Sequence, residues 1–403
     1  MKHRLQSNKG MHLLFVNAFV YISLALYIPY TSSYYSKAGI NAVQIGILLT
    51  IGPLVSIFIQ PLWAVISDRT GKKKRILSFV ILGSALTVLT YYIGKTFQAF
   101  LLAAFLLSIF STSIIPLSDA IILRNAKKNH YDFSKIRLGG TIGYAIMVNV
   151  SGAIVKMNPQ WQFALGCIGY VLLLLFVQLL PKDEMEDIVP VQQVHLPKQS
   201  LKERLNILKI FESKQIFILL AFAFISQVGL SFHYSFLGVY MIKLGLSEGT
   251  IGFINSVSAI SEIPILFLIN RILKKSSTMK ITAISCFLLG LRIMTVTGGN
   301  IVFLILAQLL HGLTYMTVYY SCAVFISNHV KPENQSKGQS ILMIVQGGIG
   351  SIVGNILGGY LVDALGLKHA YQSMSLVIVT ASAVILVCQL IYQKASAKKE
   401  LHN

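Results

Sequence analysis

Long apolar segments alternate with short polar breaks along the whole chain. Each segment stays apolar over roughly 20 residues, the length that crosses the ~30 Å hydrocarbon layer of a membrane as an α-helix. Barrel strands are disfavoured because they alternate apolar and polar positions over about ten residues. We therefore predict twelve membrane-spanning helices, at residues 11–34, 43–66, 76–94, 97–122, 137–156, 160–180, 215–241, 249–270, 280–298, 300–327, 339–362 and 370–393.

A longer polar stretch at residues 181–214 divides these spans six and six. It combines prolines with charges of both signs, which is typical of a linker followed by a short amphipathic helix on the membrane surface. The stretch YYSKAGINAVQIG at Tyr34–Gly46 returns as YMIKLGLSEGTIG at Tyr240–Gly252, after the first span of each half. The sequence thus repeats itself at the same place in both halves.

Parallel repeats of six spans build two-lobed transporters, in which the solute site lies between the lobes near mid-membrane. We predict an all-α integral membrane fold, with six-helix bundles at residues 1–180 and 215–403 and a cytoplasmic linker at 181–214. A pseudo-two-fold axis along the membrane normal is expected to relate the bundles.

Composition agrees with a lipid environment, since 55% of the 403 residues are hydrophobic and 12% are charged. The net charge of +20 is unevenly distributed along the chain. Most lysines and arginines lie at the N-terminus, in the connections that follow even-numbered spans, and in the C-terminal tail. This bias predicts a multi-pass protein of the plasma membrane with both termini in the cytoplasm. Contact of these basic residues with anionic lipid headgroups accounts for the positive charge. We therefore expect the bilayer as a partner and no nucleic acid.

The four cysteines are isolated within apolar runs, so their spacing indicates neither a metal site nor disulfides. The patterns GxxxxGK[ST], HExxH and GxSxG are absent, which argues against an ATP-driven pump, a metalloprotease and a serine hydrolase. We expect a protein that is not an enzyme and that uses no cofactor. A proton gradient is then the expected energy source.

The connection between the second and third spans reads AVISDRTGKKKR. It resembles the signature loop of the major facilitator superfamily, although Ala64 stands where the usual loop begins with glycine. The resemblance implies a conformational latch made by Asp68, Arg69, Gly71 and Lys72. From turn chemistry alone, the same residues form a tight turn after a helix.

The segment SDAIILRNAKKNHYDFSKIRLGGTIGYA is similar to the lactose permease branch of oligosaccharide:proton symporters. Asp119 falls on the sugar-binding carboxylate of that branch, Arg137 on its paired arginine and Tyr144 on an aromatic residue that stacks on the sugar. Nucleoside symporters and phenylpropionate permeases share the layout. The resemblance implies solute binding by these three residues.

Physical chemistry gives an independent reason for pairing Asp119 with Arg137. A charge at the centre of a lipid-facing helix costs at least about 2.5–3.5 kcal/mol, so such groups pair or line a wet cavity. A carboxylate beside a guanidinium offers acceptors and donors to a solute rich in hydroxyls. The alternative is that both residues only reach toward the membrane surface or hold helices together.

Polar residues also interrupt the apolar runs of the second half. His311 titrates near neutral pH and a buried Glu262 can accept a proton, so we predict proton coupling through Glu262, Arg292 and His311. In the lactose permease branch, the acid that carries the proton lies at the position of Thr314, and the eighth-span acid at that of Asn255. A packing role for His311 remains the alternative.

Amide and aromatic residues predict further parts of a cavity lining. Asn17 and Tyr21 share one face of the first span, and Gln227 lies on the seventh span near His233. We expect these four residues and Asn255 to contact the solute.

Together these observations predict a secondary active transporter that works as a monomer by alternating access. We expect proton-coupled uptake of a small polar organic solute, with a sugar or oligosaccharide favoured over a nucleoside or aromatic acid. Drug:proton antiport and a membrane sensor without net flux are the remaining alternatives.

Overall fold

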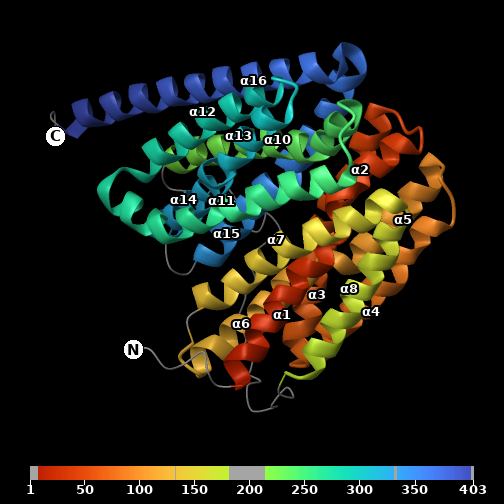
Figure 1. The fold of residues 1–403 in the computed structure, drawn as a ribbon. Coiled ribbons are helices and arrows are strands. Elements are labelled where there is room, and N and C mark those ends of the chain that lie inside the picture. Colours follow the sequence, from red (N-terminus) through yellow and green to blue (C-terminus); the bar gives the residue numbers. More distant parts are fainter. Residues whose placement is uncertain (1–7, 132, 181–213, 331–333, 401–403) are drawn as a thin grey trace. The chain divides into compact units, whose positions relative to one another are not determined.

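The computed structural model describes residues 8–131, 133–180, 214–330 and 334–400, which form helices and no strand (Figure 1). Within these ranges, 11 helical segments are long and apolar enough to cross a membrane. The last segment, residues 337–391, spans two predicted helices that meet at Gly366, where a φ of 76° departs from helical geometry. The described helices therefore confirm the predicted all-α, twelve-span membrane fold.

The helices of the first half match the predicted spans closely, but two spans are broken near their middle. The first break separates α1 from α2, which starts beside Pro29, and the second separates α5 from α6. The helices are α1 (Asn8–Ala25), α2 (Ile28–Lys37), α3 (Ala42–Thr70), α4 (Lys73–Thr87), the 3-10 helix η1 (Val88–Tyr92), α5 (Phe97–Ser111), α6 (Ile114–Lys128), α7 (Phe133–Met157) and α8 (Trp161–Gln178).

In the second half, two spans contain π-helical segments instead of sharp breaks. The helices are α10 (Lys214–Lys243), α11 (Glu248–Lys275), α12 (Thr278–Val296), α13 (Ile301–Leu309), the π-helix η4 (Gly312–Met316), α14 (Thr317–His329), α15 (Gln335–Met343), the π-helix η6 (Ile344–Gly350) and α16 (Ser351–Glu400). π-Helical turns inside α-helices occur frequently at functional sites.

The repeated sequence produces the same local structure in both halves. After α2, Gly39 adopts a φ of 84° and the N–H of Ile40 donates to the carbonyl of Tyr35, at 3.1 Å. After α10, Gly245 adopts a φ of 78° and the N–H of Leu246 donates to the carbonyl of Met241, at 3.0 Å. Both helices therefore end in a glycine-dependent Schellman motif, which explains why glycine recurs at this place.

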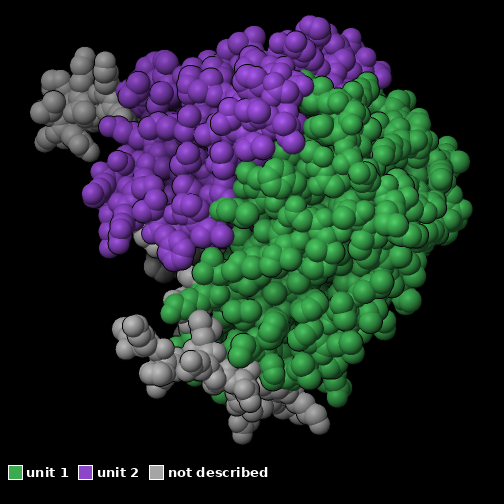
Figure 2. Space-filling view, in the orientation of Figure 1, with its two compact units in different colours: residues 1–195, 235–260 green, residues 196–234, 261–403 purple. Residues whose placement is uncertain are grey.

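Packing divides the chain into two compact units that differ from the predicted bundles (Figure 2). Unit 1 comprises residues 1–195 and 235–260, and unit 2 comprises residues 196–234 and 261–403. This division follows contacts, whereas the predicted bundles follow the sequence repeat, so the predicted domain boundaries remain a prediction. The predicted linker and amphipathic helix lie outside the described residues, except for Lys214.

Many apolar side chains point outward from the helices of both units. In α3, for example, Phe58 is 70% exposed and Leu62 is 51% exposed. Lipid accommodates such side chains, whereas water would not, so the exposed apolar surface agrees with a membrane environment. Unit 2 also has a buried apolar core that includes Phe222, Cys286 and Ile326.

Candidate functional site

The Asp119 and Arg137 side chains form an ion pair inside unit 1, as the sequence predicts. Asp119 lies on α6 and Arg137 on α7, and Nη1 of Arg137 lies 3.2 Å from Oδ2 of Asp119. Both side chains keep part of their surface exposed, 24% for Asp119 and 33% for Arg137. The pair therefore satisfies its own charges and remains accessible to a ligand.

The Tyr21 ring and the Asn17 amide of α1 lie beside this pair. The guanidinium carbon of Arg137 is 5.6 Å from the centre of the Tyr21 ring, within the range of a cation–π interaction. Oδ1 of Asn17 accepts a hydrogen bond of 3.2 Å from the N–H of Gly140 on α7. Nδ2 of Asn17 is buried and has no hydrogen-bond partner among the described residues.

Gly140 explains how α1 comes close enough to α7 for these contacts. A Cβ atom at this position would lie 2.6 Å from Oδ1 of Asn17 and would overlap the Tyr21 ring. Glycine is therefore required for the close approach of the two helices. Tyr144 follows Arg137 by seven residues on α7, so both lie on one face, and Tyr144 is half-buried.

A second polar network in unit 2 surrounds the fully buried Arg292. Its hydrogen-bond acceptors are the Ala307 carbonyl at 2.9 Å, Oγ1 of Thr314 at 3.1 Å, Oε1 of Gln308 at 2.9 Å and Nε2 of His233 at 3.2 Å. Each of these acceptors belongs to an uncharged group. We call Arg292 and these four partners the Arg292 cage.

The Arg292 cage determines the protonation of His233. Nε2 of His233 receives N–H groups from both Arg292 and Gln308, the latter at 3.2 Å. Because both of these groups donate, Nε2 must carry the lone pair, and His233 is neutral with its proton on Nδ1. The structure thus places His233, predicted to contact the solute, inside the cage with no exposed surface.

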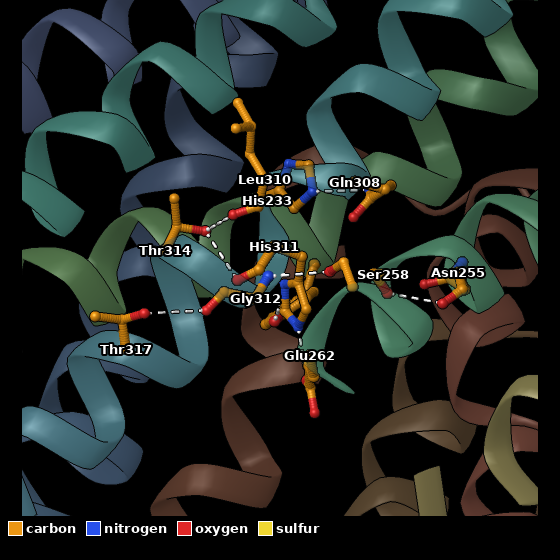
Figure 3. A network of polar contacts seen from close by, with 12 residues as sticks. His233, Asn255, Ser258, Glu262, Gln308, Leu310, His311, Gly312, Thr314 and Thr317 are labelled. Carbon is orange, nitrogen blue, oxygen red and sulfur yellow. Dashed lines mark hydrogen bonds and ion pairs between the residues drawn. The ribbon is translucent and has the colours of Figure 1, made fainter. Parts of the chain in front are cut away.

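His311 and Glu262 meet in unit 2, next to the cage residue Thr314 (Figure 3). Nε2 of His311 lies 2.9 Å from Oε1 of Glu262, and Nδ1 of His311 lies 3.3 Å from the Tyr234 hydroxyl. The Glu262 side chain is 18% exposed, whereas that of His311 is 5% exposed. The carboxyl group is therefore the more accessible member of the pair.

The π-helix η4 begins directly after His311. The N–H of Gly312 donates to Oγ of Ser261 on α11, at 3.0 Å, so the irregular turn ties this span to the helix of Glu262. A Cβ atom at Gly312 would overlap the Ser261 carbonyl, which makes glycine necessary at this contact. The close contact of Gly312 with Ser261 lies directly beside the pair, because each of these residues neighbours one member of it in sequence.

Two kinds of residue in this network are absent from the residues predicted from sequence. Thr314 accepts a hydrogen bond from Arg292. In the sequence it was noted only because the lactose permease branch has an acidic residue at this position. Tyr315 stacks on His311 with ring centres 5.1 Å apart, and Tyr319 stacks on Tyr315 at 6.2 Å. The spacing of His311, Tyr315 and Tyr319 at every fourth position is the signal that could have revealed this stack.

The remaining predicted lining residues have mainly local contacts. Nε2 of Gln227 donates to the hydroxyls of Ser231 and Ser351, each at 3.0 Å. Nδ2 of Asn255 donates to the Ile251 carbonyl of its own helix, at 2.8 Å, and Asn255 belongs to unit 1. Solute contact by Gln227 and Asn255 therefore remains a prediction.

The predicted latch loop contains an ion pair in the described structure. Asp68 pairs at 3.2 Å with Lys73, which directly follows the four predicted latch residues. Gly71 adopts a φ of 65° and ends α3, which fits the tight turn. A latch role for these residues remains a prediction. Among the described residues, no cluster of His, Cys, Asp or Glu could hold a metal ion.

Comparison with known proteins assigns the chain to a family. Residues 11–373 match the MFS_1 like family. The uncharacterized transporter YwbF of Bacillus subtilis is 26% identical over 69% of this chain and 66% of its own length. The maltose permease of Geobacillus stearothermophilus is 22% identical over 91% of each chain.

A nucleoside transporter provides both a sequence and a structural match. The nucleoside permease NupG of Escherichia coli is 23% identical over 80% of each chain. A crystal structure of a NupG variant superposes with a TM-score of 0.81, at 20% identity, covering 95% of this chain and 99% of that chain. The chain therefore belongs to the MFS_1 like family and is a membrane transporter of the major facilitator superfamily, similar to the oligosaccharide and nucleoside permeases.

Proposed function

We propose that this transporter takes up a small polar organic solute, a sugar or oligosaccharide first, together with protons and by alternating access. The observation that carries the proposal is the half-buried Asp119–Arg137 ion pair beside the Tyr21 ring. A structural ion pair in lipid would be expected to lie fully buried between helices. Partial exposure of both members instead supports a role in binding a ligand.

The chemistry of this site suits a ring that carries hydroxyl groups. Asp119 accepts hydrogen bonds and Arg137 donates them. Tyr21 and Tyr144 can pack against the apolar face of a sugar ring. The sugar preference also agrees with the similarity to the maltose permease of Geobacillus stearothermophilus.

Uptake of radiolabelled solutes into proteoliposomes with an imposed pH gradient tests the binding site. Each charge-assisted hydrogen bond to the solute contributes about 1.5–3 kcal/mol, so Asp119→Asn and Arg137→Lys are expected to weaken binding about 10- to 100-fold. Asp363→Asn and Arg271→Lys are matched controls, because both residues are exposed. Unchanged affinity in both site variants would remove Asp119 and Arg137 from the proposal.

A nucleoside or an aromatic acid is the second candidate solute. The aromatic stack of His311, Tyr315 and Tyr319 favours it, because a planar ring can extend such a stack. Competition of labelled maltose uptake by uridine and by 3-phenylpropionate separates the candidates. If neither class is taken up but acidification releases lipophilic cations, drug:proton antiport would be favoured. If no solute moves at all, a sensor without net flux would be favoured.

Proton coupling is proposed to use the His311–Glu262 pair. The Tyr234 hydroxyl can donate to Nδ1 of a neutral His311 or accept from Nδ1–H of a protonated one. His311 can therefore gain a proton without losing either hydrogen bond. Glu262, the more exposed partner, can exchange that proton with water. Arg292 keeps its uncharged partners in both states.

Glu262→Gln tests the coupling. The amide still forms a hydrogen bond to His311 but cannot carry the proton, so we expect solute exchange to persist and accumulation against a gradient to stop. Asp363→Asn again serves as the control, and Asp119→Asn should instead weaken binding itself. Uphill uptake by Glu262→Gln would show that another group carries the proton.

The chain is a multi-pass membrane protein, and its bacterial permease relatives favour the plasma membrane. We propose that both termini are cytoplasmic, that the monomer is the working unit, and that the proton gradient replaces any cofactor. A fluorescent protein at either terminus would be expected to mature and glow in the cytoplasm. Dark fusions at both ends would reverse the proposed orientation.

A further inference from the structure

The start of α11 packs against helices of the first half of the chain, although the sequence repeat assigns α11 to the second half. Residues 235–260, which include the end of α10 and the start of α11, belong to unit 1 together with α2 and α7. In a transporter built from parallel repeats, the solute passes between the two repeats. A contact that joins segments of both repeats therefore blocks that path for as long as it persists.

The hydroxyl group of Tyr30 lies where α2, α7 and α11 meet. Tyr30 of α2 is fully buried, and its hydroxyl donates a hydrogen bond to the Val148 carbonyl of α7. A Cβ atom at Gly152 of α7 would lie 3.0 Å from this hydroxyl, and one at Gly252 of α11 would lie 2.8 Å from it. Helices from both repeats therefore enclose the hydroxyl.

The backbones of α7 and α11 touch each other at the two glycines. A Cβ atom at Gly252 would overlap the Val148 carbonyl, and one at Gly152 would lie 2.7 Å from the Glu248 carbonyl. Small residues allow membrane helices to approach this closely. The contact leaves no space for a solute between these two described helices at this level.

An ion pair lies beyond this contact, on the side that the lysine and arginine bias assigns to the outside. Lys37, in the last turn of α2, pairs with Glu248, in the first turn of α11. The Glu248 side chain is 6% exposed, whereas that of Lys37 is 39% exposed. Ala42 stands at the position of Glu248 in the first half, so the acid is an addition to the repeat.

Each member of the ion pair also has a favourable place in its own helix. A cation in the last turn of a helix and an anion in the first turn both interact favourably with the helix dipole. Separation of Lys37 from Glu248 therefore leaves each charge stabilised by its own helix and by water. A contact of this kind can open and close repeatedly.

From these contacts we propose a seal on the outer side of the transport path, which opens once in each transport cycle. We call it the outer seal, and its members are Tyr30, Gly152, Gly252 and the Lys37–Glu248 pair. The ion pair sets how often the outer seal opens. This inference rests on the proposed alternating access and on the proposed orientation of the termini.

Labelling of a cysteine inside the outer seal tests the proposal. Ser151→Cys places a thiol at a fully buried position, because Oγ of Ser151 lies 3.2 Å from the Tyr30 hydroxyl. The four native cysteines are replaced by alanine. A membrane-impermeant methanethiosulfonate is added to intact cells that express the full chain, without any solute. The result therefore does not depend on which solute the protein carries.

The two members of the ion pair are expected to respond unequally. Lys37→Met leaves the nearly buried Glu248 carboxylate unpaired, so labelling should be about tenfold faster than in the parent. Glu248→Gln leaves only the more exposed Lys37, so labelling should be about threefold faster. Combining both substitutions removes the unpaired carboxylate and should slow labelling relative to Lys37→Met alone. Lys243→Met is the matched control, because Lys243 is exposed and stands at the position of Lys37 in the second half.

A substitution at the glycine contact gives an independent test. Gly252→Ala places a methyl group against the Val148 carbonyl, so the outer seal should be held apart and labelling should be faster than in the parent. Gly249→Ala, on the same helix, meets no atom closer than 3.6 Å and serves as the control. Size-exclusion chromatography of each variant in detergent separates opening of the outer seal from loss of folding.

Two results would overturn the proposal. The first is that the Ser151→Cys thiol stays unlabelled in the folded parent and in every folded variant, which would make the contact permanent. The second is that Lys37→Met is labelled no faster than Lys243→Met, which would remove the ion pair from the outer seal. Faster labelling of Lys37→Met in a protein that carries none of the tested solutes would support the outer seal and count against the proposed solute alone.

Discussion

Replacing Thr314 by valine tests whether the Arg292 cage holds a buried charge. Valine keeps the shape of threonine but removes the oxygen that accepts the hydrogen bond of 3.1 Å from Arg292. Both residues have no exposed surface, so water cannot replace the lost acceptor. A hydrogen bond to a charged group contributes about 1.5–3 kcal/mol, and we expect the free energy of unfolding to fall by about this amount.

The expected loss converts to a measurable temperature. For a unit of 150–250 residues, about 1 kcal/mol shifts the midpoint of thermal unfolding by about 2–4 °C, so Thr314→Val should unfold about 3–12 °C earlier. Cys286 and Cys322 are buried in the core of unit 2 and become reactive when it unfolds. A thiol-reactive fluorescent dye, added during slow heating in detergent, therefore reports the transition.

Two controls separate the hydrogen bond from other effects of the substitution. Thr314→Ser keeps the hydroxyl and should lose little of this stability. Thr380→Val removes a hydroxyl that donates to the Leu376 carbonyl of its own helix, at 2.7 Å on the exposed surface, and should stay within about 0.5 kcal/mol of the parent. Equal unfolding temperatures for Thr314→Val and Thr380→Val would refute the idea that Thr314 stabilises Arg292.

Two further predictions concern unit 1. Gly140→Ala places a methyl group in the Tyr21 ring, which is expected to lower stability by about 1–3 kcal/mol and to weaken solute binding, whereas Gly249→Ala meets no atom closer than 3.6 Å. Similar behaviour of the two alanine variants would argue against the tight α1–α7 contact. Lys37 forms an ion pair with the nearly buried Glu248. A double-mutant cycle of Lys37→Met and Glu248→Gln on the free energy of unfolding should give a coupling energy of about 1 kcal/mol. Additive effects of the two substitutions would contradict the pair.

Sequence patterns predicted the spans because lipid imposes a simple rule on the chain. Each crossing must be a continuous helix that satisfies its own backbone, and this requirement is visible as a run of apolar residues. Small departures have local causes, such as Pro29 at the break in the first span and Gly366 between the last two spans. The repeated turns at Gly39 and Gly245 were also visible in the sequence, because each turn needs a glycine with positive φ.

The polar sites were only partly visible in the sequence. Asp119, Arg137, Glu262, Arg292 and His311 stood out because charged or titratable groups are costly in apolar helices. Their partners could be inferred for Asp119 and Arg137 through a family resemblance, but not for the others. His311 and Glu262 lie 49 residues apart, on different helices whose packing the sequence does not show.

The sequence by itself thus determined that the chain crosses the membrane as helices, that its two halves share a repeat, and which polar residues need partners. Only the tertiary structure decided that Thr314 accepts a hydrogen bond from Arg292 and that His233 is a neutral member of the cage. The physical reason is that apolarity is a property of each segment, whereas a hydrogen-bond partner depends on how helices rotate and pack against one another.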